Sequence, residues 1–555
     1  MTRRAARRNS SLPSALPLVA AVSLALVSCG GGEPGDDAST GNGDVAGEVV
    51  STASGASGLG TVSFPTSCDS AVEADFDRAV AMLHSFWFPE AHEAFESIAE
   101  RDRDCAMAHW GIAMNSWGNP MTRAEPSPDR RTRGEEAVAR ARELADGATE
   151  RERMYIEAAG ALYDDHESVG HIERMRAHED AMRRVMEAHP EDEEAAIFYA
   201  RIVIGNAPPD DQAYARQLHA AEILEPLFEE QPRHPGLAHY LIHAFDAPPI
   251  AERGSDAAMR YADVAPDAPH ALHMPTHIFT RLGYWEESVE LNQRSSRAEP
   301  EPDAAVHPLD YMVYAYLQMG MDDAAGEVVR RATTETDSFY GGLLGYNYAA
   351  MQARYALERD RWTEAAELPL GEDVPPYVMG VTHFARGIGA ARSGQMERAR
   401  GEIEALAGLR DSLEAAGDSY WATVVEAQRL AAAAWVARDG GDEAEALRLA
   451  TEAAELEGTV EKHPVTPGPI LPARELLGDL QMELDDPEAA LRSYEETLEE
   501  EPRRARALYG AARAAEEAGD AAAAARHYEA LSELLSEADE DRPDLRAARE
   551  WESRM

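Results

Sequence analysis

The chain has 555 residues, enough for several domains or for one long array of repeats. Hydrophobic residues make up 44% and charged residues 28%, as in globular proteins, whereas aromatic residues at 7% are few for one large conventional core. The formal net charge of −50 repels phosphate groups, so nucleic acids and anionic membrane surfaces are poor candidate partners. Such acidity favours basic peptides, metal cations or a saline habitat.

The first 28 residues have the features of an export signal. Four arginines precede an apolar run over residues 16–26, which is too short to span a membrane as a mature helix. The run leads into Leu-Val-Ser-Cys at 26–29, which resembles the lipobox of bacterial lipoproteins. We therefore expect Cys29 to carry a lipid anchor, and Gly30 after it favours the outer membrane, facing the periplasm. An ordinary signal peptide cleaved nearby is the alternative.

Residues 29–65 are rich in Gly, Ser and Asp and show no helical period, which predicts a disordered tether. A Gly-rich coil of this length would reach about 30 to 35 Å. The two remaining cysteines, Cys68 and Cys105, would pair most simply as a disulfide in an oxidising envelope. Two buried free thiols are the alternative.

A repeat of 34 residues governs the end of the chain. Leu477-Gly478, Asp485, Ala490 and Tyr494 recur at this offset as Ala511-Ala512, Gly519, Ala524 and Tyr528. Small residues at fixed spacing let two helices of a hairpin touch, a pattern typical of tetratricopeptide repeats. Weaker copies extend back to residue 91. We therefore predict that residues 66–555 form an all-α, right-handed superhelical solenoid of roughly a dozen antiparallel helix pairs.

Five longer runs carry a family resemblance. They are Phe76 to Pro120, HYLIHAFDAP, PHALHMPTHIFTRLGYW, EKHPVTPGPILPARELLGDL and RALYGAARAAE. They resemble a family of bacterial envelope tetratricopeptide-repeat lipoproteins, and the resemblance covers almost the whole mature chain. It implies the fold and the compartment but brings no reaction with it.

Histidines gather in the middle of the chain. His239 and His273 differ by one repeat length, and so do His243 and His277, which predicts that these rings meet on neighbouring helices. Asp310 and Tyr314 precede Gly320 by the same numbers of residues by which His273 and His277 precede Gly283. We therefore expect Asp310 and Tyr314 to face the same side of the repeats as these histidines. We expect a concave ligand groove lined by these residues together with His270, His307, Glu461 and His463.

The same residues could hold a metal ion. Neutral imidazoles with one carboxylate suit zinc, iron or manganese, and the candidate ligands are His239, His243, His273, His277 and Asp310. Three facts weigh against a metal. Pro275 interrupts the helix between His273 and His277, the His239–His243 pentad lacks the glutamate of a zinc-protease helix, and buried histidines are often hydrogen-bonded cement between repeats.

Residues 461–469 contain three prolines and form a stiff irregular segment. Glu461 and His463 within it could fold over the groove as an acid and a base, although bridging two mismatched repeats is the simpler role. His84 with the aromatic residues 86–88 is interpreted as core. The sequence lacks a Gly-rich phosphate loop, a Gly-x-Ser-x-Gly elbow and a CxxC pair, which disfavours the corresponding enzymes.

Three functions remain open. The first is a non-enzymatic scaffold that binds a peptide, a protein or a small ligand in its groove. The second is a metal-binding protein or metal-dependent enzyme built on the histidines. The third is a structural subunit of an outer-membrane assembly.

Overall fold

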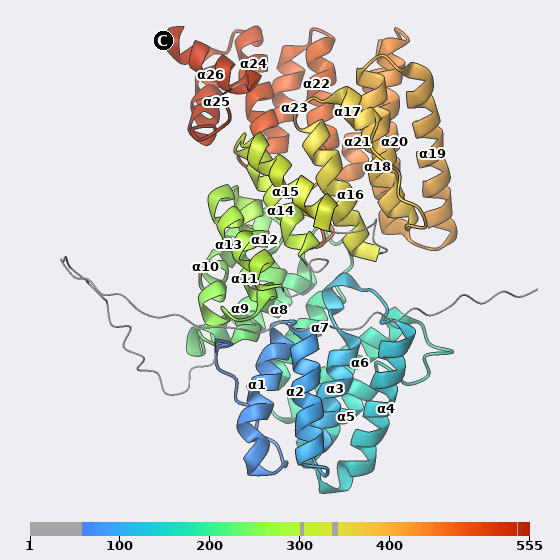
Figure 1. The fold of residues 1–555 in the computed structure, drawn as a ribbon, viewed down its shortest axis with the longest axis vertical. Coiled ribbons are helices and arrows are strands. Elements are labelled where there is room, and N and C mark those ends of the chain that lie inside the picture. The colour runs from blue at the N-terminus through green and yellow to red at the C-terminus, as the bar shows by residue number, and fades with distance from the viewer. Residues whose placement is uncertain (1–57, 300–304, 336–341, 541, 555) are drawn as a thin grey trace, which may run out of the picture. The chain divides into compact units, whose positions relative to one another are not determined.

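The structure is a computed structural model that describes residues 58–299, 305–335, 342–540 and 542–554. The export signal, Cys29 and the tether up to residue 57 lie outside the described residues. Helices and short 3-10 turns account for all the regular structure in the described ranges, as Figure 1 shows. Among these helices, none is both long and apolar enough to cross a membrane.

The first half of the fold runs from α1 to α13. Its helices are α1 (Glu73–His84), α2 (Phe88–Arg101), α3 (Ala106–Trp117), α4 (Pro128–Leu144), α5 (Glu150–Gly160), α6 (His171–Ala188), α7 (Glu193–Gly205), α8 (Ala215–Glu230), α9 (Pro235–Phe245), α10 (Ser255–Val264), α11 (Pro269–His273), α12 (Pro275–Leu282) and α13 (Trp285–Ala298).

The second half runs from α14 to α26. Its helices are α14 (Val306–Gln318), α15 (Asp322–Glu335), α16 (Gly342–Leu357), α17 (Trp362–Ala366), α18 (Pro376–Arg392), α19 (Met396–Ala415), α20 (Ser419–Asp439), α21 (Glu443–Glu457), α22 (Ala473–Glu483), α23 (Pro487–Glu500), α24 (Ala505–Ala518), α25 (Ala521–Leu534) and α26 (Pro543–Arg554).

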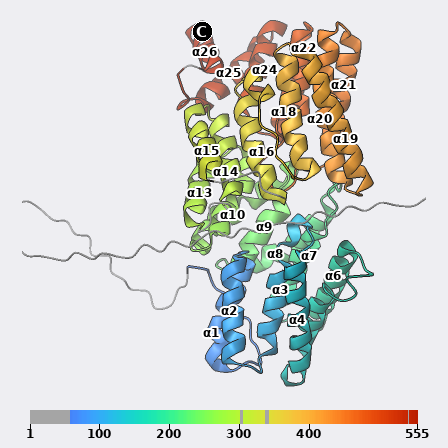
Figure 2. The ribbon, with the colours of Figure 1, turned by 45° about the vertical axis from the view of Figure 1, so that its right-hand side comes forward.

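Successive helices pack side by side as hairpins, as both ribbon views show (Figures 1 and 2). From α18 to α22 each helix contacts the next one in the chain, and α18 also contacts α20, within the group seen in Figure 2. The predicted all-α, tetratricopeptide-like solenoid is therefore confirmed.

The repeat signal has a direct steric cause. A Cβ atom on Gly510 would lie 2.4 Å from the ring of Tyr494, and one on Gly478 would lie 2.9 Å from the same ring. Both glycines thus let the aromatic side chain enter the crossing between helices. The turn positions Asp485 and Gly519 both have positive φ, at 62° and 79°, a backbone that few residue types tolerate.

The C-terminal repeats dock back on the middle of the array. One hydrophobic core is shared by α13 to α16 and α24 to α26, and it includes Val313, Leu317 and Leu531. The indole of Trp285 donates to the carbonyl of Arg503 at 3.2 Å, and the amide of Asp539 donates to the carbonyl of Gly320 at 3.1 Å. These contacts join segments about two hundred residues apart, which a purely open solenoid lacks.

The segment before α1 is part of the folded unit. Leu59 and Phe64 are fully buried, and the amide of Thr61 donates to the carbonyl of Arg233 at 2.9 Å. The predicted tether therefore ends too late, because its apolar residues from 59 onward belong to the core. A disulfide joins Cys68, just before α1, to Cys105, just before α3.

Candidate metal centre

Six histidine rings from four helices form one cluster. Helix α9 supplies His239 and His243, α11 supplies His270 and His273, and α12 and α14 supply one ring each, at His277 and His307. They divide into two groups of three, and within each group the nitrogens suited to bind a metal lie within 4.8 Å of one another. The deep triad is His273, His277 and His307, and the outer triad is His239, His243 and His270.

Hydrogen bonds fix the tautomers of two rings in the deep triad. The amide nitrogen of Asn292 donates to the carbonyl of Ser288 at 2.9 Å, so its oxygen faces His273 and accepts from Nδ1 at 2.6 Å. Nδ1 of His277 donates to the carboxylate of Asp246 at 2.9 Å. In both neutral rings the proton is therefore on Nδ1, and Nε2 carries a lone pair.

Those two lone pairs face each other. The Nε2 atoms of His273 and His277 are 3.1 Å apart, with both side chains almost fully buried. Two unprotonated nitrogens at this distance repel unless a proton or a cation lies between them. Two imidazole ligands of a tetrahedral ion with bonds of about 2.0 to 2.1 Å have their nitrogens roughly 3.3 Å apart. The observed distance is close to that value.

The third ring of the deep triad also has an unused nitrogen. Nδ1 of His307 is buried and finds no hydrogen-bond partner among the described residues. The His307 ring lies 4.4 Å from that of His273 and 6.0 Å from that of His277, measured between centroids. Its side chain is half-buried, so the triad opens toward solvent on this side.

The outer triad repeats the arrangement. Nδ1 of His239 donates to the carbonyl of His84 at 2.6 Å, and its Nε2 lies 3.2 Å from Nε2 of His270. Nε2 of His243 is buried and has no hydrogen-bond partner in the described part of the chain. Phe86, whose φ of 52° is unusual for a bulky residue, stacks on the ring of His270 at 5.4 Å.

Burial keeps these rings neutral. It lowers the pKa of His273 to about 3, and the nearby His277 ring adds to the effect. Burial also lowers the pKa of the other five rings, with neighbouring histidines contributing in the outer triad and at His307. Neutral imidazoles are the form that binds metals.

Asp246 orders the surroundings of the deep triad. Besides His277, its carboxylate accepts from Nε of Arg281 at 3.0 Å and from the ammonium of Lys462 at 3.0 Å. A carboxylate behind a ligating imidazole fixes the ring orientation and raises its basicity in known metal sites. Asp246 has this position relative to His277.

The chain's own irregular segment covers this region. The side-chain amide of Asn347 donates to the carbonyl of Val465 at 2.6 Å, and Arg354 donates to the carbonyl of Gly468 at 2.7 Å. Tyr311, between the deep triad and the segment, donates to the carbonyl of Thr466 at 3.1 Å. Residues 461–469 therefore occupy the face where the sequence predicted an extended ligand.

Two predicted wall residues lie elsewhere. Asp310 forms a buried ion pair with Arg354 and accepts from Asn347 at 3.0 Å, and Tyr314 donates to Glu501 at 3.1 Å. Asp310 is therefore not a ligand beside the histidines. The prediction extrapolated the repeat through a hairpin of different length. His307 and Tyr311 are the residues of α14 that lie against His273 and His277.

Glu461 and His463 anchor the segment instead of acting as a free acid and base. Glu461 is bonded to the hydroxyl of Tyr214 and lies 3.3 Å from Arg281. Nδ1 of His463 accepts from the amide of Val465 at 3.1 Å, and the ring stacks on Trp421. Burial lowers the pKa of His463 to about 4, so this ring is neutral at pH 7.

A neighbouring histidine pair, His84 and His234, has a purely structural role. His84 and His234 each donate through Nε2 to one oxygen of the buried Glu194, at 2.9 Å. Their Nδ1 atoms accept, from Tyr240 at 2.9 Å and from the amide of Leu237 at 3.3 Å. All four ring nitrogens are satisfied, which distinguishes this network from both triads.

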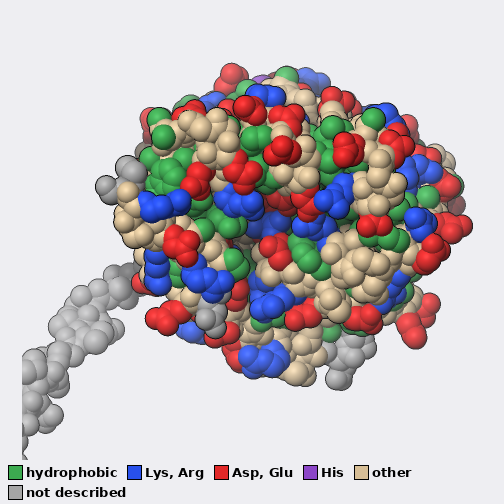
Figure 3. Space-filling view, turned by 90° about the horizontal axis from the view of Figure 1, so that it is seen from above, with side chains coloured by type: hydrophobic (Ala, Val, Ile, Leu, Met, Phe, Trp, Pro, Cys, Tyr) green, Lys and Arg blue, Asp and Glu red, His purple; other side chains and the backbone are tan. Residues whose placement is uncertain are grey.

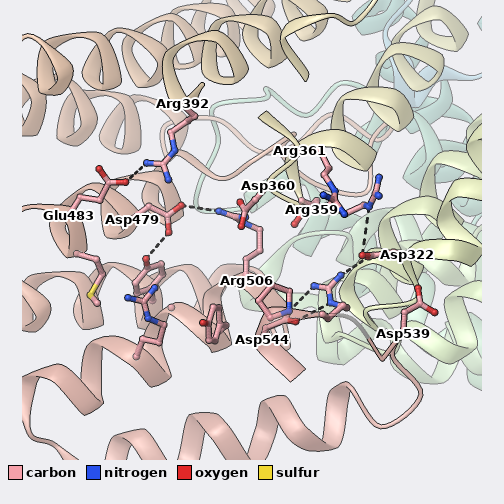
Figure 4. Close-up of a pocket in the computed structure, with 18 of the residues that line it drawn as sticks. Asp322, Arg359, Asp360, Arg361, Arg392, Asp479, Glu483, Arg506, Asp539 and Asp544 are labelled. Atoms are coloured by element: carbon pink, nitrogen blue, oxygen red, sulfur yellow. Dashed lines mark hydrogen bonds and ion pairs between the residues drawn. The ribbon is translucent and has the colours of Figure 1, made fainter. Parts of the chain in front are cut away.

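A separate cavity of about 920 Å³ lies among α15, α18, α22, α23, α24 and α26 and the turn before α17. Figure 4 shows its charged lining, in which Arg506 pairs with Asp360 and Asp479, and Arg542 pairs with Asp322 and Asp544. The face seen in Figure 3 likewise mixes basic and acidic side chains and shows almost no histidine. These ion pairs already neutralise one another, so the lining offers less to a ligand than the histidine cluster.

Several residues of the site carry no signal in the sequence. Asp246 falls within the HYLIHAFDAP run, but its role depends on Lys462, more than two hundred residues later. Asn292 follows His273 by 19 residues and reaches it from the next helix of the hairpin. Phe86 was interpreted as core, and its ring also forms one wall of the outer triad.

No protein-family model and no curated protein matches the chain. Among solved structures, the fold is similar to the human IFIT1 dimer with m7Gppp-AAAA, at 10% identity and a TM-score of 0.36, over 77% of this chain and 90% of that one. It is also similar to the human IFIT1 dimer with PPP-AAAA, at 10% identity and 0.36, over 82% and 89%. At this level the likeness says nothing about a ligand of the present chain.

Proposed function

We propose that this protein binds a first-row transition-metal ion through His273, His277 and His307. The observation that carries the proposal is the pair of Nε2 atoms 3.1 Å apart, each on a ring whose Nδ1 proton is already committed to an acceptor. A bound cation would remove the repulsion between the two lone pairs. The unpartnered Nδ1 of His307 would be a third ligand atom.

The ligand chemistry narrows the choice of metal. Imidazole nitrogens suit zinc, copper, iron and nickel, whereas manganese prefers carboxylate and water ligands. With Asp310 paired to Arg354 instead, the deep triad contains no carboxylate ligand, which removes the reason to expect manganese. Copper binds nitrogen sites most tightly among these ions, and zinc favours three imidazole ligands with an open fourth position, so these two are the ions to test first.

Three protein ligands leave a coordination position for a water molecule or a small substrate. A zinc or copper ion in such a site acts as a Lewis acid and lowers the pKa of bound water. Asp246 would hold His277 in the ligating tautomer, and Lys462 would bring a positive charge next to that carboxylate. The site is thus suited to small anionic ligands.

The scaffold hypothesis is less favoured at these residues. The face predicted to take an extended peptide is covered by the chain's own residues 464–468, whose carbonyls already accept bonds from Tyr311, Asn347 and Arg354. A partner peptide would have to displace this segment.

The direct test is elemental analysis of the full chain produced without an affinity tag rich in histidine and without chelator. We expect at least one metal ion per chain in the wild type and one fewer in His277→Gln. The matched control is His178→Gln, which alters another almost fully buried histidine that belongs to neither triad and is bonded to the carbonyl of Ala158. A wild type that folds normally, contains no metal and takes up none from added Zn²⁺ or Cu²⁺ contradicts the proposal.

We also propose that the protein works in the bacterial envelope, anchored through a lipid on Cys29. Support comes from the charged and apolar pattern of residues 1–28 and from the disulfide between Cys68 and Cys105, a bond typical of oxidising compartments. The substitution Cys29→Ser should move the protein from the membrane fraction to the soluble fraction. Retention of Cys29→Ser in the membrane would contradict the lipid anchor.

A further inference from the structure

We infer that the two histidine triads form one dinuclear centre, in which the outer triad holds a second metal ion and a small oxygen ligand bridges the pair. This inference rests on the proposed function, because it takes the deep triad as the first metal site. The outer triad is a separate observation, since its three residues share no ligand atom with the deep triad.

In the outer triad, as in the deep triad, buried ring nitrogens carry lone pairs that no described hydrogen-bond donor fills. His239 has its Nδ1 proton committed to the carbonyl of His84, so its Nε2 carries a lone pair toward Nε2 of His270. A hydrogen bond donated by Nε2 of His270 would give the lone pair of His239 a partner. It would still leave Nε2 of His243 buried without a hydrogen-bond partner among the described residues. One ion bound by the three rings accounts for all three nitrogens.

The two triads are in direct contact. The ring of His243 lies 6.1 Å from that of His277, and the ring of His270 lies 6.2 Å from that of His273, between centroids. The facing rings belong to different triads in both pairs. In two-metal sites the ions are about 3.5 to 4 Å apart, which is close enough for one oxygen atom to bind both.

Charge indicates what the bridge is. All six ligands are neutral imidazoles, and Asp246, the carboxylate hydrogen-bonded to His277, is already paired with Arg281 and Lys462. Two dications would therefore bring four positive charges that the ligands do not balance. A bridging hydroxide or another small oxyanion would offset part of this charge.

The cluster also has an open side for such a ligand. His243, His270 and His307 are half-buried, whereas His239, His273 and His277 are almost fully buried. Each triad thus combines deep rings, fixed by hydrogen bonds, with rings that reach solvent. A small anion can approach from the side of the half-buried rings.

Copper titration of the metal-free full chain tests the inference. We expect two Cu²⁺ per chain and an electron paramagnetic resonance signal well below the total copper, because bridged Cu²⁺ ions couple magnetically. His243→Gln should bind one Cu²⁺ and show the full signal of an isolated ion. His270→Gln, at a half-buried position, is the second variant in case His243→Gln fails to fold. The control is His92→Gln, a half-buried histidine outside both triads that contacts Glu96.

The outcomes separate the two proposals. One Cu²⁺ per chain, unchanged in His243→Gln and in His270→Gln, overturns the dinuclear centre and leaves the deep triad standing. Two Cu²⁺ with a signal equal to the total copper overturns the bridge between them. No bound copper in a folded wild type overturns both the inference and the proposed function.

Discussion

A buried imidazole is stable when both of its nitrogens have partners, and the two kinds of histidine in this protein differ in this respect. His84 and His234 share Glu194 and are fully satisfied. His273 and His277 point lone pairs at each other. The residue type is the same in both groups, and the hydrogen-bond partners of the rings separate a structural histidine from a candidate ligand.

The sequence predicted the histidine cluster but not its division into triads. The offset of 34 residues brought His243 and His277 to neighbouring helices, and their rings do meet. The same extrapolation failed at Asp310 and Tyr314, because the following hairpin is not an exact copy of its predecessor. The partners that fix the tautomers, Asn292 and Asp246, lie on other helices and follow no periodic rule.

Arg354 is the counter-ion of Asp310, and both side chains are completely buried. Replacing it by Met leaves a buried carboxylate without its cation, which costs about 3 to 5 kcal/mol of the free energy of unfolding. Chemical denaturation should show this loss. Arg330→Met removes a pair of two exposed side chains on α15 and should change stability by less than about 0.5 kcal/mol. Equal effects of the two substitutions would contradict the assignment.

His178 should make stability depend on pH. Burial lowers its pKa from 6.5 to about 4 in the folded protein, so the unfolded chain takes up a proton first as pH falls. The contribution of His178 to stability is complete above pH 6.5 and is lost between about pH 6.5 and 4. Because the pKa differs between the folded and unfolded states, the free energy of unfolding falls by about 3 kcal/mol over this pH range.

The check compares the free energy of unfolding of the wild type with that of His178→Gln across this range. The difference between the two proteins should be largest above pH 6.5 and should shrink as the pH is lowered. A difference that does not change with pH would show that folding does not lower the pKa of this ring.

At the scale of elements, the break between α11 and α12 shapes the deep triad. Met274 separates the two helices, as Pro275 in the sequence suggested, yet the Nε2 atoms of His273 and His277 still lie 3.1 Å apart. The regular C-terminal hairpins were predictable because small residues must face Tyr494 there. The path of residues 461–469 was not, since it depends on side chains from α14 and α16 distant in sequence.

Tyr311 should stabilise residues 461–469 against local opening. Tyr311→Phe removes the donor to the carbonyl of Thr466, and an unmet buried carbonyl costs about 1 to 3 kcal/mol. Hydrogen exchange of amides in 461–469 should become faster by about tenfold or more. Tyr316→Phe, on the same helix but bonded to Gln293, is the control. Unchanged exchange in Tyr311→Phe would contradict the role of this bond.

At the scale of the whole molecule, docking of the C-terminal repeats on the middle repeats couples regions that a linear array keeps independent. Gly283 is part of this contact, because a Cβ atom there would lie 2.7 Å from the carbonyl oxygen of Pro502. No local sequence pattern around Gly283 predicts this contact with Pro502. The sequence predicted the helix pairs, but contacts between turns two hundred residues apart lie beyond any repeat rule.

Trp285 tests this coupling. The side chain is fully buried and its indole donates to the carbonyl of Arg503, so Trp285→Ala should cost about 3 to 5 kcal/mol. Amide exchange should accelerate in both α14 and α24. Trp551→Ala, near the C-terminus and stacked on Tyr528, should affect only the last repeats. Acceleration confined to α13 and its sequence neighbours would indicate an open array.

The most direct test of the metal centre is anomalous X-ray diffraction from crystals of the full chain grown with Zn²⁺ or Cu²⁺, recorded on either side of the metal's absorption edge. We expect an anomalous peak about 2.0 to 2.2 Å from Nε2 of both His273 and His277, with His307 as the third ligand. A map with no peak between these nitrogens, from crystals in which both rings are ordered, would contradict the metal centre.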